Sequence, residues 1–368
     1  MSRKLKALVA VPAVLATFVA FLATGCNIAE EGKVEDTKIA AVAQNRSISA
    51  SGSTAIEPLI DRWGADYAKS HPLVVNYRPT GSGAGIQNLR NNYGAFAASD
   101  APLAGSQLQG LPAIVQIPVT TGPVCVVYNV PGLKTPLKLS GATLAGIFSS
   151  EIISWQDPAI ARENPGAALP HAAIIVVHRA DGSGTTSILT NYLSKASPAW
   201  ATKYGAGLSV KWAAGIGASG SSGVIKAVLD TQGTIGYIEL TFARTSGASV
   251  ASIQNRAGEY VAPTPESAYA AVSAATGLLA KDIQAPIVDP PATAKGAYPI
   301  TGVTFILIPK DNKSTDGEQE ALKDYLTYVL TTGQDAAPEL SYAKLPPSLQ
   351  QQSVALLSQL TENGQPIK

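Results

Sequence analysis

Three short segments of the chain combine glycine with serine or threonine just before a pattern of apolar residues that predicts a helix. They occupy residues 49–55, 80–85 and 179–186, and the third begins with Arg179. A helix N-terminus presents free N–H groups and a partial positive charge, so it can bind an anion. Glycine lets the backbone approach a ligand, and hydroxyls add donors. A single loop of this kind is often an ordinary helix cap, but three loops with an arginine predict an oxyanion site.

A carboxylate stands out beside these donors. Asp100 closes a predicted strand within the segment 99–102. Taken alone, it is most simply a turn or cap residue. Beside a bound anion it would repel the ligand, unless the ligand carries a proton that Asp100 can accept. The combination therefore favours an oxyanion that is protonated near neutral pH.

The elements that position these residues alternate along the chain from Ser47 onward, which predicts α/β architecture. Strands are expected at 74–77, 96–99, 114–128, 173–177, 235–240 and 303–308, and helices at 56–68, 86–92, 187–194, 224–229, 322–330 and 354–360. The apolar run 114–130 is too long for one ordinary strand. A crossing of the chain between two domains would explain its length.

The N-terminal residues predict export. A positively charged start precedes the apolar run 7–23, as in a secretory signal, here residues 1–25. An uncleaved transmembrane anchor is the alternative, because the run is near the lower length limit for spanning. The segment 22–26 resembles a bacterial lipobox, which implies that Cys26 is diacylated and becomes the mature N-terminus. Residues 26–46 are polar and charged, and we expect a flexible tether there.

Composition excludes several function classes. The 368 residues carry a net charge of +1, with 46% hydrophobic and 14% charged residues. A folded protein is expected, and a general nucleic-acid binder is not, because that class shows a clustered basic surface. Apart from Cys26, the single cysteine is Cys125, in an apolar run, so no disulfide framework is expected.

The sequence also gives little support to an enzyme. None of the three histidines, at 71, 171 and 178, shows metal-ligand spacing, so neither a metal nor a cofactor is expected. The glycine-rich loops lack the lysine of a nucleotide P-loop. The residues around Ser183 do not form the G-x-S-x-G elbow of a hydrolase. No catalytic residue is therefore assigned.

Several motifs together resemble the PstS family, the phosphate-binding subunit of the high-affinity phosphate ABC importer. The resemblance runs from about Ile48 to the C-terminus and rests mainly on Ala-Ser-Asp-Ala-Pro at 98–102 and Arg-x-Asp-Gly-Ser-Gly-Thr at 179–185. Further segments of the same resemblance are 52–54, 81–83, 154–160, 233–237, 298–301 and 342–346.

The resemblance implies roles for particular residues. Donors would come from Thr54, Ala55 and Ser82 in the first half of the site, and Asp100 would accept the proton of the phosphate. The second half would consist of Arg179, Ser183, Gly184 and Thr185, with Asp181 holding Arg179 in place. The family often has phenylalanine where this chain has Ala55, so apolar packing over the ligand would be lost while the backbone N–H is kept.

The resemblance also implies a two-lobed periplasmic-binding-protein fold with the ligand cleft between the lobes. Lobe I would comprise residues 47–119 and 300–368, and lobe II residues 120–299. Such a protein, expected to be a monomer held to the membrane by its lipid, would capture inorganic phosphate and deliver it to the permease subunits of an ABC importer. The alternatives are a binding protein for sulfate, molybdate or an organic phosphate, and a secreted phosphatase.

Overall fold

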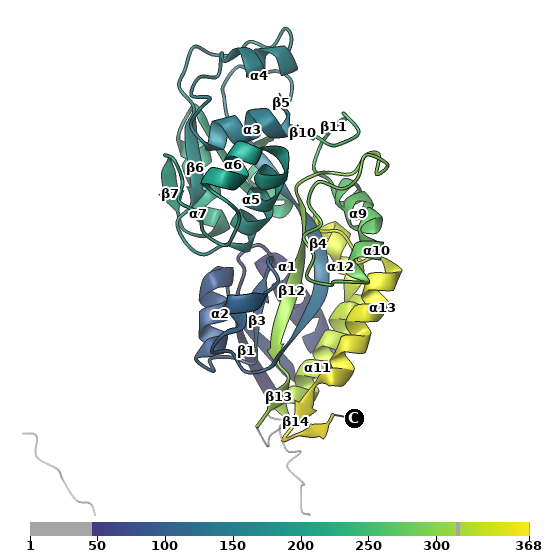
Figure 1. Ribbon diagram of the computed structural model, residues 1–368. Coiled ribbons are helices and arrows are strands. Elements are labelled where there is room, and N and C mark those ends of the chain that lie inside the picture. Colours follow the sequence, from purple (N-terminus) through teal and green to yellow (C-terminus); the bar gives the residue numbers. More distant parts are fainter. Residues whose placement is uncertain (1–45, 314–316, 368) are drawn as a thin grey trace, which may run out of the picture. The chain divides into compact units, whose positions relative to one another are not determined.

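Nine strands form one continuous sheet in the computed structural model, which describes residues 46–313 and 317–367. The predicted signal 1–25, the lipidation site Cys26 and the tether up to residue 45 lie outside the described residues. The sheet has the order β2-β1-β3-β12-β4-β8-β6-β7, with β9 beside β4 (Figure 1). Its strands are β1 (Arg46–Gly52), β2 (Leu73–Arg78), β3 (Phe96–Ser99), β4 (Ile114–Asn129), β6 (Ile175–Arg179), β7 (Ile216–Ala218), β8 (Thr234–Glu239), β9 (Ser249–Val250) and β12 (Thr301–Pro309).

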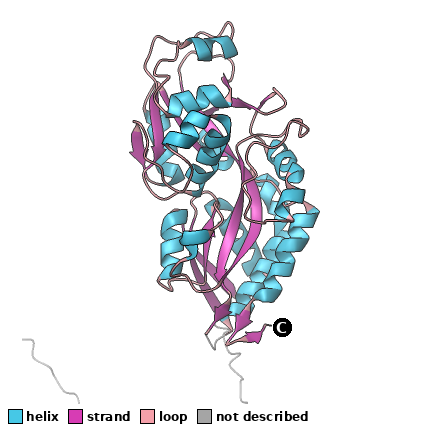
Figure 2. Cartoon of the chain, in the orientation of Figure 1, coloured by secondary structure: helices cyan, strands magenta, loops and turns pink. Residues whose placement is uncertain are grey.

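Helices cover the strands in both halves of the sheet (Figure 2). They are α1 (Glu57–Ala68), α2 (Ser82–Arg90), α3 (Gly141–Phe148), α4 (Pro158–Glu163), α5 (Gly184–Ala196), α6 (Pro198–Lys203), α7 (Gly220–Asp230), α8 (Leu240–Ser246), α9 (Pro265–Ala274), α10 (Thr276–Leu279), α11 (Glu318–Leu330), α12 (Ala336–Glu339) and α13 (Pro347–Leu356). Two small sheets complete the fold. The first consists of β5 (Lys138–Leu139), β10 (Ser252–Gln254) and β11 (Tyr260–Val261). The second consists of β13 (Asp311–Asn312), β14 (Thr361–Glu362) and β15 (Gln365–Pro366).

The strand pairing divides the sheet into two α/β halves joined by antiparallel strands. In the first half β1 pairs in parallel with β2 and β3, and in the second half β6 pairs in parallel with β7 and β8. Between the halves, β12 pairs antiparallel with both β3 and β4, and β4 pairs antiparallel with β8. The expected α/β fold is confirmed.

The long apolar run forms a single strand, β4, of 16 residues. Its first part, including Ile117, packs in the hydrophobic core around Trp63 and Phe305. Its second part packs in a different core, where Val126 lies among residues that include Trp155. The strand therefore passes from one hydrophobic core to another, and the parts of the molecule around these cores are called lobe I and lobe II below.

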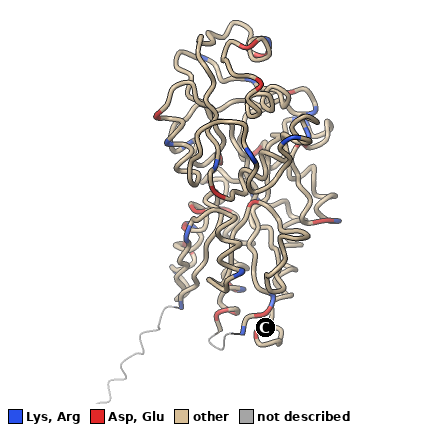
Figure 3. The backbone as a smooth tube through the Cα atoms, turned by 60° about the vertical axis from the view of Figure 1, so that its left-hand side comes forward, with Lys and Arg blue, Asp and Glu red and all other residues tan. Residues whose placement is uncertain are grey.

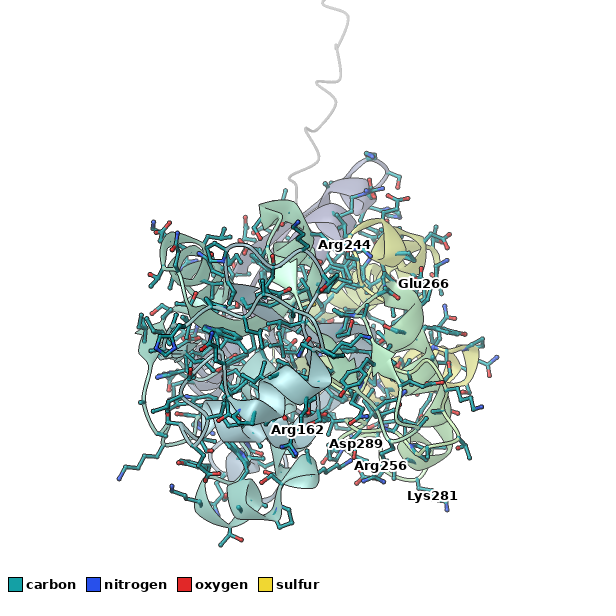
Figure 4. All side chains as sticks on the ribbon, turned by 90° about the horizontal axis from the view of Figure 1, so that it is seen from above. Arg162, Arg244, Arg256, Glu266, Lys281 and Asp289 are labelled. Carbon is teal, nitrogen blue, oxygen red and sulfur yellow. The ribbon has the colours of Figure 1, made fainter. Side chains whose placement is uncertain are left out.

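One segment expected in lobe II packs with lobe I. Val272 on α9, Leu279 on α10 and Ala275 between these helices are buried in the core that contains Trp63. The chain then returns toward lobe II, where Asp289 forms an ion pair of 2.6 Å with Arg256 (Figure 4). The boundaries 120–299 and 300–368 stay a prediction, because both lobes belong to one compact unit.

Two hydrogen bonds join α8 to the segment before α13. The hydroxyl of Thr241 donates to the carbonyl of Leu340, and Nη1 of Arg244 donates to Oγ of Ser341 at 3.1 Å. In Figure 4 Arg244 lies near Glu266, at the start of α9. These contacts fix α8 of lobe II against a segment of lobe I.

Charged residues are scattered along the described chain, without a cluster of one sign (Figure 3). Cys125, the cysteine of β4, is a free and fully buried thiol, as expected for a small apolar side chain. No helix among the described residues is long and apolar enough to cross a membrane.

Candidate ligand-binding site

The three predicted loops come together where the two lobes meet. The loop after β1 leads into α1, while the second and third loops place the first turns of α2 and α5 opposite each other. The amide of Gly83 donates to the carbonyl of Gly182 at 2.9 Å, and the amide of Gly184 donates to Oγ of Ser82 at 3.1 Å. Donor groups from distant parts of the chain thus share one buried region.

Asp100 lies at the centre of this region. It is 5% exposed and follows β3 of lobe I. The hydroxyl of Ser53 donates to its Oδ2 at 2.5 Å, and that of Thr304 donates to its Oδ1 at 2.8 Å. The register of β12 shifts between Thr304 and Phe305, and such a bulge re-aims side chains.

The environment of Asp100 favours its protonated form. Burial raises the pKa of Asp100 to about 6, and the neighbouring Glu239 adds to this effect. The hydrogen bonds from Ser53 and Thr304 and the charge of Arg179 oppose it. Asp100 is therefore a proton acceptor whose ionisation falls within the physiological range.

The helix N-terminus of α5 faces this carboxylate at contact distance. A Cβ added to Gly184 would lie 2.6 Å from Cβ of Asp100 and 2.7 Å from its backbone nitrogen. Ser183 caps the helix, because its Oγ accepts the amide of Thr186 at 3.2 Å. Gly184 therefore allows an approach of the two lobes that no other residue would permit.

Arg179 is paired with Asp181. Nε of Arg179 donates to Oδ1 of Asp181 at 2.7 Å, Nη2 donates to Oδ2, and the arginine side chain is 2% exposed. Burial alone would raise the pKa of Asp181, but the hydrogen bonds and charge of Arg179 outweigh it and lower that pKa. The amide of Gly220 adds a third donor to Asp181 at 3.1 Å. The fork of Arg179 is thus fixed in orientation.

Gly81 makes room for this pair from lobe I. Its φ of 91° is unfavourable for residues with a side chain. A Cβ at this position would lie 2.4 Å from Oδ2 of Asp181 and 3.4 Å from Nη2 of Arg179. The glycine of the second loop is therefore required by the close approach of the third loop.

The side chain of Thr54 forms hydrogen bonds with lobe II. Its Oγ1 lies 2.8 Å from Oγ of Ser221 and accepts the amide of Ser221 at 3.2 Å. Ser221 in turn donates to Oε2 of Glu239 at 2.7 Å, and Thr185 donates to Oε1 of the same carboxylate. A chain of hydrogen bonds therefore links the first loop of lobe I to the start of α5 in lobe II.

Ala55 is buried beside the site, at 5% exposure. Its amide points to Oγ of Ser53 at 3.1 Å, and its carbonyl accepts the hydroxyl of Tyr342 at 2.6 Å. The ring of Tyr342 lines the same cavity as Ala55 and Asp100. The methyl side chain at this position thus lies next to an aromatic residue from the C-terminal part of the chain.

The cavity at this point is small. Its volume is about 20 Å³, close to the space that one water molecule needs. It is lined by Ala55, Asp100, Gly122, Pro123, Val124, Ile188, Glu239, Leu240, Thr241, Gly302, Thr304, Ser341 and Tyr342. The two lobes are in direct contact here, so the polar groups of the site touch one another.

The structure brings the predicted ligand contacts of the two lobes into one hydrogen-bonded region, of which Ala55 and Asp100 line the cavity, and it adds other residues. Asp100 and the third loop lie in contact, and Thr54, Ser82 and Thr185 bond across the lobes or beside the cavity. The residues missed by the sequence analysis are Ser53, Ser221, Glu239 and Thr304. The sequence contains one signal for Glu239: it is an acidic residue at the end of a buried strand, as Asp100 is an acidic residue directly after one. In the described residues no group of three or more His, Cys, Asp or Glu could hold a metal ion.

Comparisons with known proteins agree with this arrangement. The model of the PBP superfamily domain matches residues 38–332. A phosphate-binding protein from Stenotrophomonas maltophilia has a TM-score of 0.66 at 22% identity, covering 84% of this chain and 93% of that chain. A high-affinity periplasmic phosphate-binding protein solved with phosphate has a TM-score of 0.65 at 22% identity, with the same coverage of 84% and 93%. The fold is that of a periplasmic-binding-protein domain.

Sequence relatives narrow this class to a family. The phosphate-binding protein PstS of Xylella fastidiosa strain Temecula1 is 42% identical over 306 residues, which is 83% of both chains. That of Haemophilus influenzae is 38% identical over 305 residues, or 83% of this chain and 90% of the relative. The archaeal relative from Methanocaldococcus jannaschii is 38% identical over 310 residues, or 78% and 79%. The chain belongs to the PstS family of phosphate-binding proteins.

Proposed function

We propose that this protein captures inorganic phosphate outside the cytoplasm and delivers it to an ABC importer. Because the chain belongs to a family of binding proteins, its function is binding and not catalysis. The family and the fold support this proposal, and the chemistry of the site supports the choice of ligand.

The observation that carries the choice of phosphate is the position of Asp100. It is a buried carboxylate against the N-terminus of α5 and near Arg179. An anion that brings no proton would meet like charge there. Near neutral pH phosphate carries one or two protons and sulfate carries none, so phosphate can donate to Asp100 and sulfate cannot.

The proposed ligand contacts divide between the lobes. Lobe I contributes Asp100 as proton acceptor and the donors of the first two loops, and lobe II contributes the guanidinium of Arg179 and the first turn of α5. In full, we propose the contacts Thr54, Ala55, Ser82, Asp100, Arg179, Ser183, Gly184 and Thr185, with Asp181 as the support of Arg179. A ligand that needs both halves stabilises the closed arrangement of the lobes.

Calorimetric titration with phosphate, arsenate and sulfate at neutral pH tests this function. We expect phosphate and arsenate to bind and sulfate to bind far more weakly. Arg179→Ala weakens phosphate binding at least tenfold, because a hydrogen bond to a charged group contributes about 1.5–3 kcal/mol. Equal affinity for phosphate and sulfate in the wild type would contradict the assignment and would favour a binding protein for another oxyanion.

The proposal extends to the membrane through Cys26. We propose that acylation of this cysteine anchors the mature, monomeric protein near the permease subunits of the importer, since two acyl chains hold a protein stably at a bilayer. Cys26→Ala should release a phosphate-binding protein from the membrane fraction or block its processing. A processed variant that stays in the membrane fraction would remove lipidation from the proposal.

A further inference from the structure

Tyr237 is a fully buried residue of β8, and the proposed ligand contacts do not include it. Its ring packs against the rings of Phe148 and Trp212, with centroid distances of 5.8 Å and 5.9 Å. These neighbours hold the ring in place within the core of lobe II. The hydroxyl at the end of the ring therefore has a fixed position.

This hydroxyl bonds both ends of the third loop. At one end it accepts the backbone amide of Arg179 at 3.1 Å, and at the other it lies 2.6 Å from Oγ1 of Thr186. Arg179 is the last residue of β6, and Thr186 lies in the first turn of α5. One buried oxygen thus joins the end of the strand to the start of the helix.

The pairing between β6 and β8 ends before the loop begins. It covers Ile175 and Val176 and does not reach Arg179. Because Arg179 is buried, its amide needs an acceptor, and a buried N–H group without one costs free energy. The hydroxyl of Tyr237 supplies that acceptor where the ladder between the two strands has ended.

Tyr237 keeps its proton at neutral pH. Burial raises the pKa of Tyr237 to about 12, although the hydrogen bonds with Thr186 and with the amide of Arg179 oppose this effect. A neutral hydroxyl has one proton to donate and two lone pairs to accept. It can therefore bond to both ends of the loop at the same time.

We propose that Tyr237 is a positioning residue for phosphate, which fixes the guanidinium of Arg179 and the N-terminus of α5 relative to each other. The inference rests on the proposed function, in which these two groups form the half of the site in lobe II. Asp181 anchors the side chain of Arg179, and Tyr237 anchors its backbone. Donors that are already held in place need not be ordered when the ligand binds, so affinity is gained.

The test compares phosphate affinity in wild type, Tyr237→Phe and Tyr128→Phe by calorimetry at neutral pH. Phenylalanine keeps the aromatic ring and removes only the hydroxyl. We expect Tyr237→Phe to weaken phosphate binding by roughly fivefold or more, because two hydrogen bonds that hold the third loop are lost. Equal affinity in wild type and Tyr237→Phe would overturn the inference.

Tyr128→Phe is the matched control. Tyr128 is buried in the same core of lobe II, and its hydroxyl accepts the amide of Leu137 at 3.1 Å. This bond is of the same kind as that between Tyr237 and Arg179. Its loss should lower the melting temperature and leave phosphate affinity unchanged. If affinity fell in Tyr128→Phe as much as in Tyr237→Phe, the effect would reflect general destabilisation of lobe II, and the inference would be wrong.

A second readout reports the position of Arg179 without any ligand. In the isotope-labelled protein, the NMR signal of its Nε–H, identified by its absence in Arg179→Ala, reports the bond to Asp181. We expect this signal to shift or broaden in Tyr237→Phe and to stay unchanged in Tyr128→Phe. An unchanged signal in Tyr237→Phe would overturn the inference, because a residue that only stabilises the core leaves Arg179 in place.

The outcomes separate the two proposals. A wild type that does not bind phosphate overturns the proposed function, while the NMR signal of Arg179 still tests the role of Tyr237. A wild type that binds phosphate, with full affinity in Tyr237→Phe, overturns the role of Tyr237 alone.

Thr186→Val keeps the inference testable if Tyr237→Phe does not fold. Thr186 is the partner of Tyr237 in the 2.6 Å bond, and valine has the shape of threonine without its hydroxyl. In this variant α5 loses its bond to Tyr237 while the amide of Arg179 keeps its acceptor. Phosphate affinity should fall about threefold or more, and full affinity in Thr186→Val would contradict the positioning of α5 by Tyr237.

Discussion

Asp100 receives two hydrogen bonds from its own lobe, from Ser53 and from Thr304. These hydroxyls hold the carboxylate in place while leaving lone pairs on both oxygens for a ligand proton. The recognition of phosphate thus depends on an acceptor held rigidly among donors. This is a chemical property of one residue, and it can be tested by single substitutions.

Asp100→Asn should reduce the discrimination between phosphate and sulfate. The amide is neutral and can turn an N–H toward a fully deprotonated anion, so sulfate gains affinity. A site built around one required hydrogen bond can reject an analogue by roughly 10⁴–10⁵, and most of that factor should be lost. Competition calorimetry measures it, with arsenate as a control that competes in both proteins. Retention of the wild-type preference would show that discrimination arises elsewhere.

Sulfate affinity in the wild type should rise as the pH falls through about 6, the pKa of Asp100. Sulfate does not titrate in this range, whereas protonated Asp100 can donate a hydrogen bond to it. Ionisation above this pH removes that donor and adds repulsion, so the affinity falls. Titration with sulfate between pH 5 and pH 8, roughly one pH unit or more on either side of this pKa, measures the effect. The same profile in Asp100→Asn should be flat, and a flat wild-type profile would contradict the role of Asp100.

At the scale of elements, local patterns predicted most of the strands and helices but not their ends. The run expected as a strand at 114–128 is β4 (Ile114–Asn129), because its apolar and β-branched residues are buried in both lobes. The helix expected at 187–194 begins at Gly184, since Ser183 caps it. The helix expected at 354–360 is wrong in its bounds, because α13 ends at Leu356 and a 3₁₀ turn follows.

The part of the site missed by the sequence depends on long-range pairing. Glu239 lies opposite Val124 because β8 pairs antiparallel with β4. Ser221 meets Thr54 across 167 positions of the sequence. Loop composition indicates which segments can bind an anion, but it does not show which hydroxyls and acids the sheet places beside them.

The close packing of α5 on the loop after β3 gives a prediction at the scale of elements. In Gly184→Ala the added Cβ would lie 2.6–2.7 Å from atoms of Asp100. Since those atoms include backbone, the two lobes must move apart, and we expect at least a tenfold loss of phosphate affinity with little change in the melting temperature. Calorimetry and thermal unfolding measure the two effects.

The matched control is Gly277→Ala, on α10, where an added Cβ meets nothing within 4 Å. Phosphate affinity should be unchanged in this variant. A Gly184→Ala protein with full affinity would show that α5 and Asp100 need not approach each other for binding.

At the scale of the whole molecule, the bonds across the lobes describe a closed arrangement. They join Gly83 to Gly182, Ser82 to Gly184 and Thr54 to Ser221. None of these bonds survives a separation of the lobes. The ligand contacts proposed here come from the same residues or their neighbours, so closure and binding are coupled.

Small-angle X-ray scattering should therefore show a smaller radius of gyration with saturating phosphate than without it. Sulfate at the same concentration serves as the control and should leave the radius unchanged near neutral pH. An identical radius with and without phosphate, at concentrations where calorimetry shows full binding, would argue against coupled closure.

The place of β12 in the sheet has a consequence for biosynthesis. This strand lies between β3 and β4, yet it is made from residues 301–309, after the whole of lobe II has been synthesised. Until then β3 and β4 lack a shared neighbour, and their open edges can pair with other chains. A nascent or truncated chain that stops before residue 301 should thus need chaperone protection. Lobe I becomes complete only when nearly the entire polypeptide is available to fold.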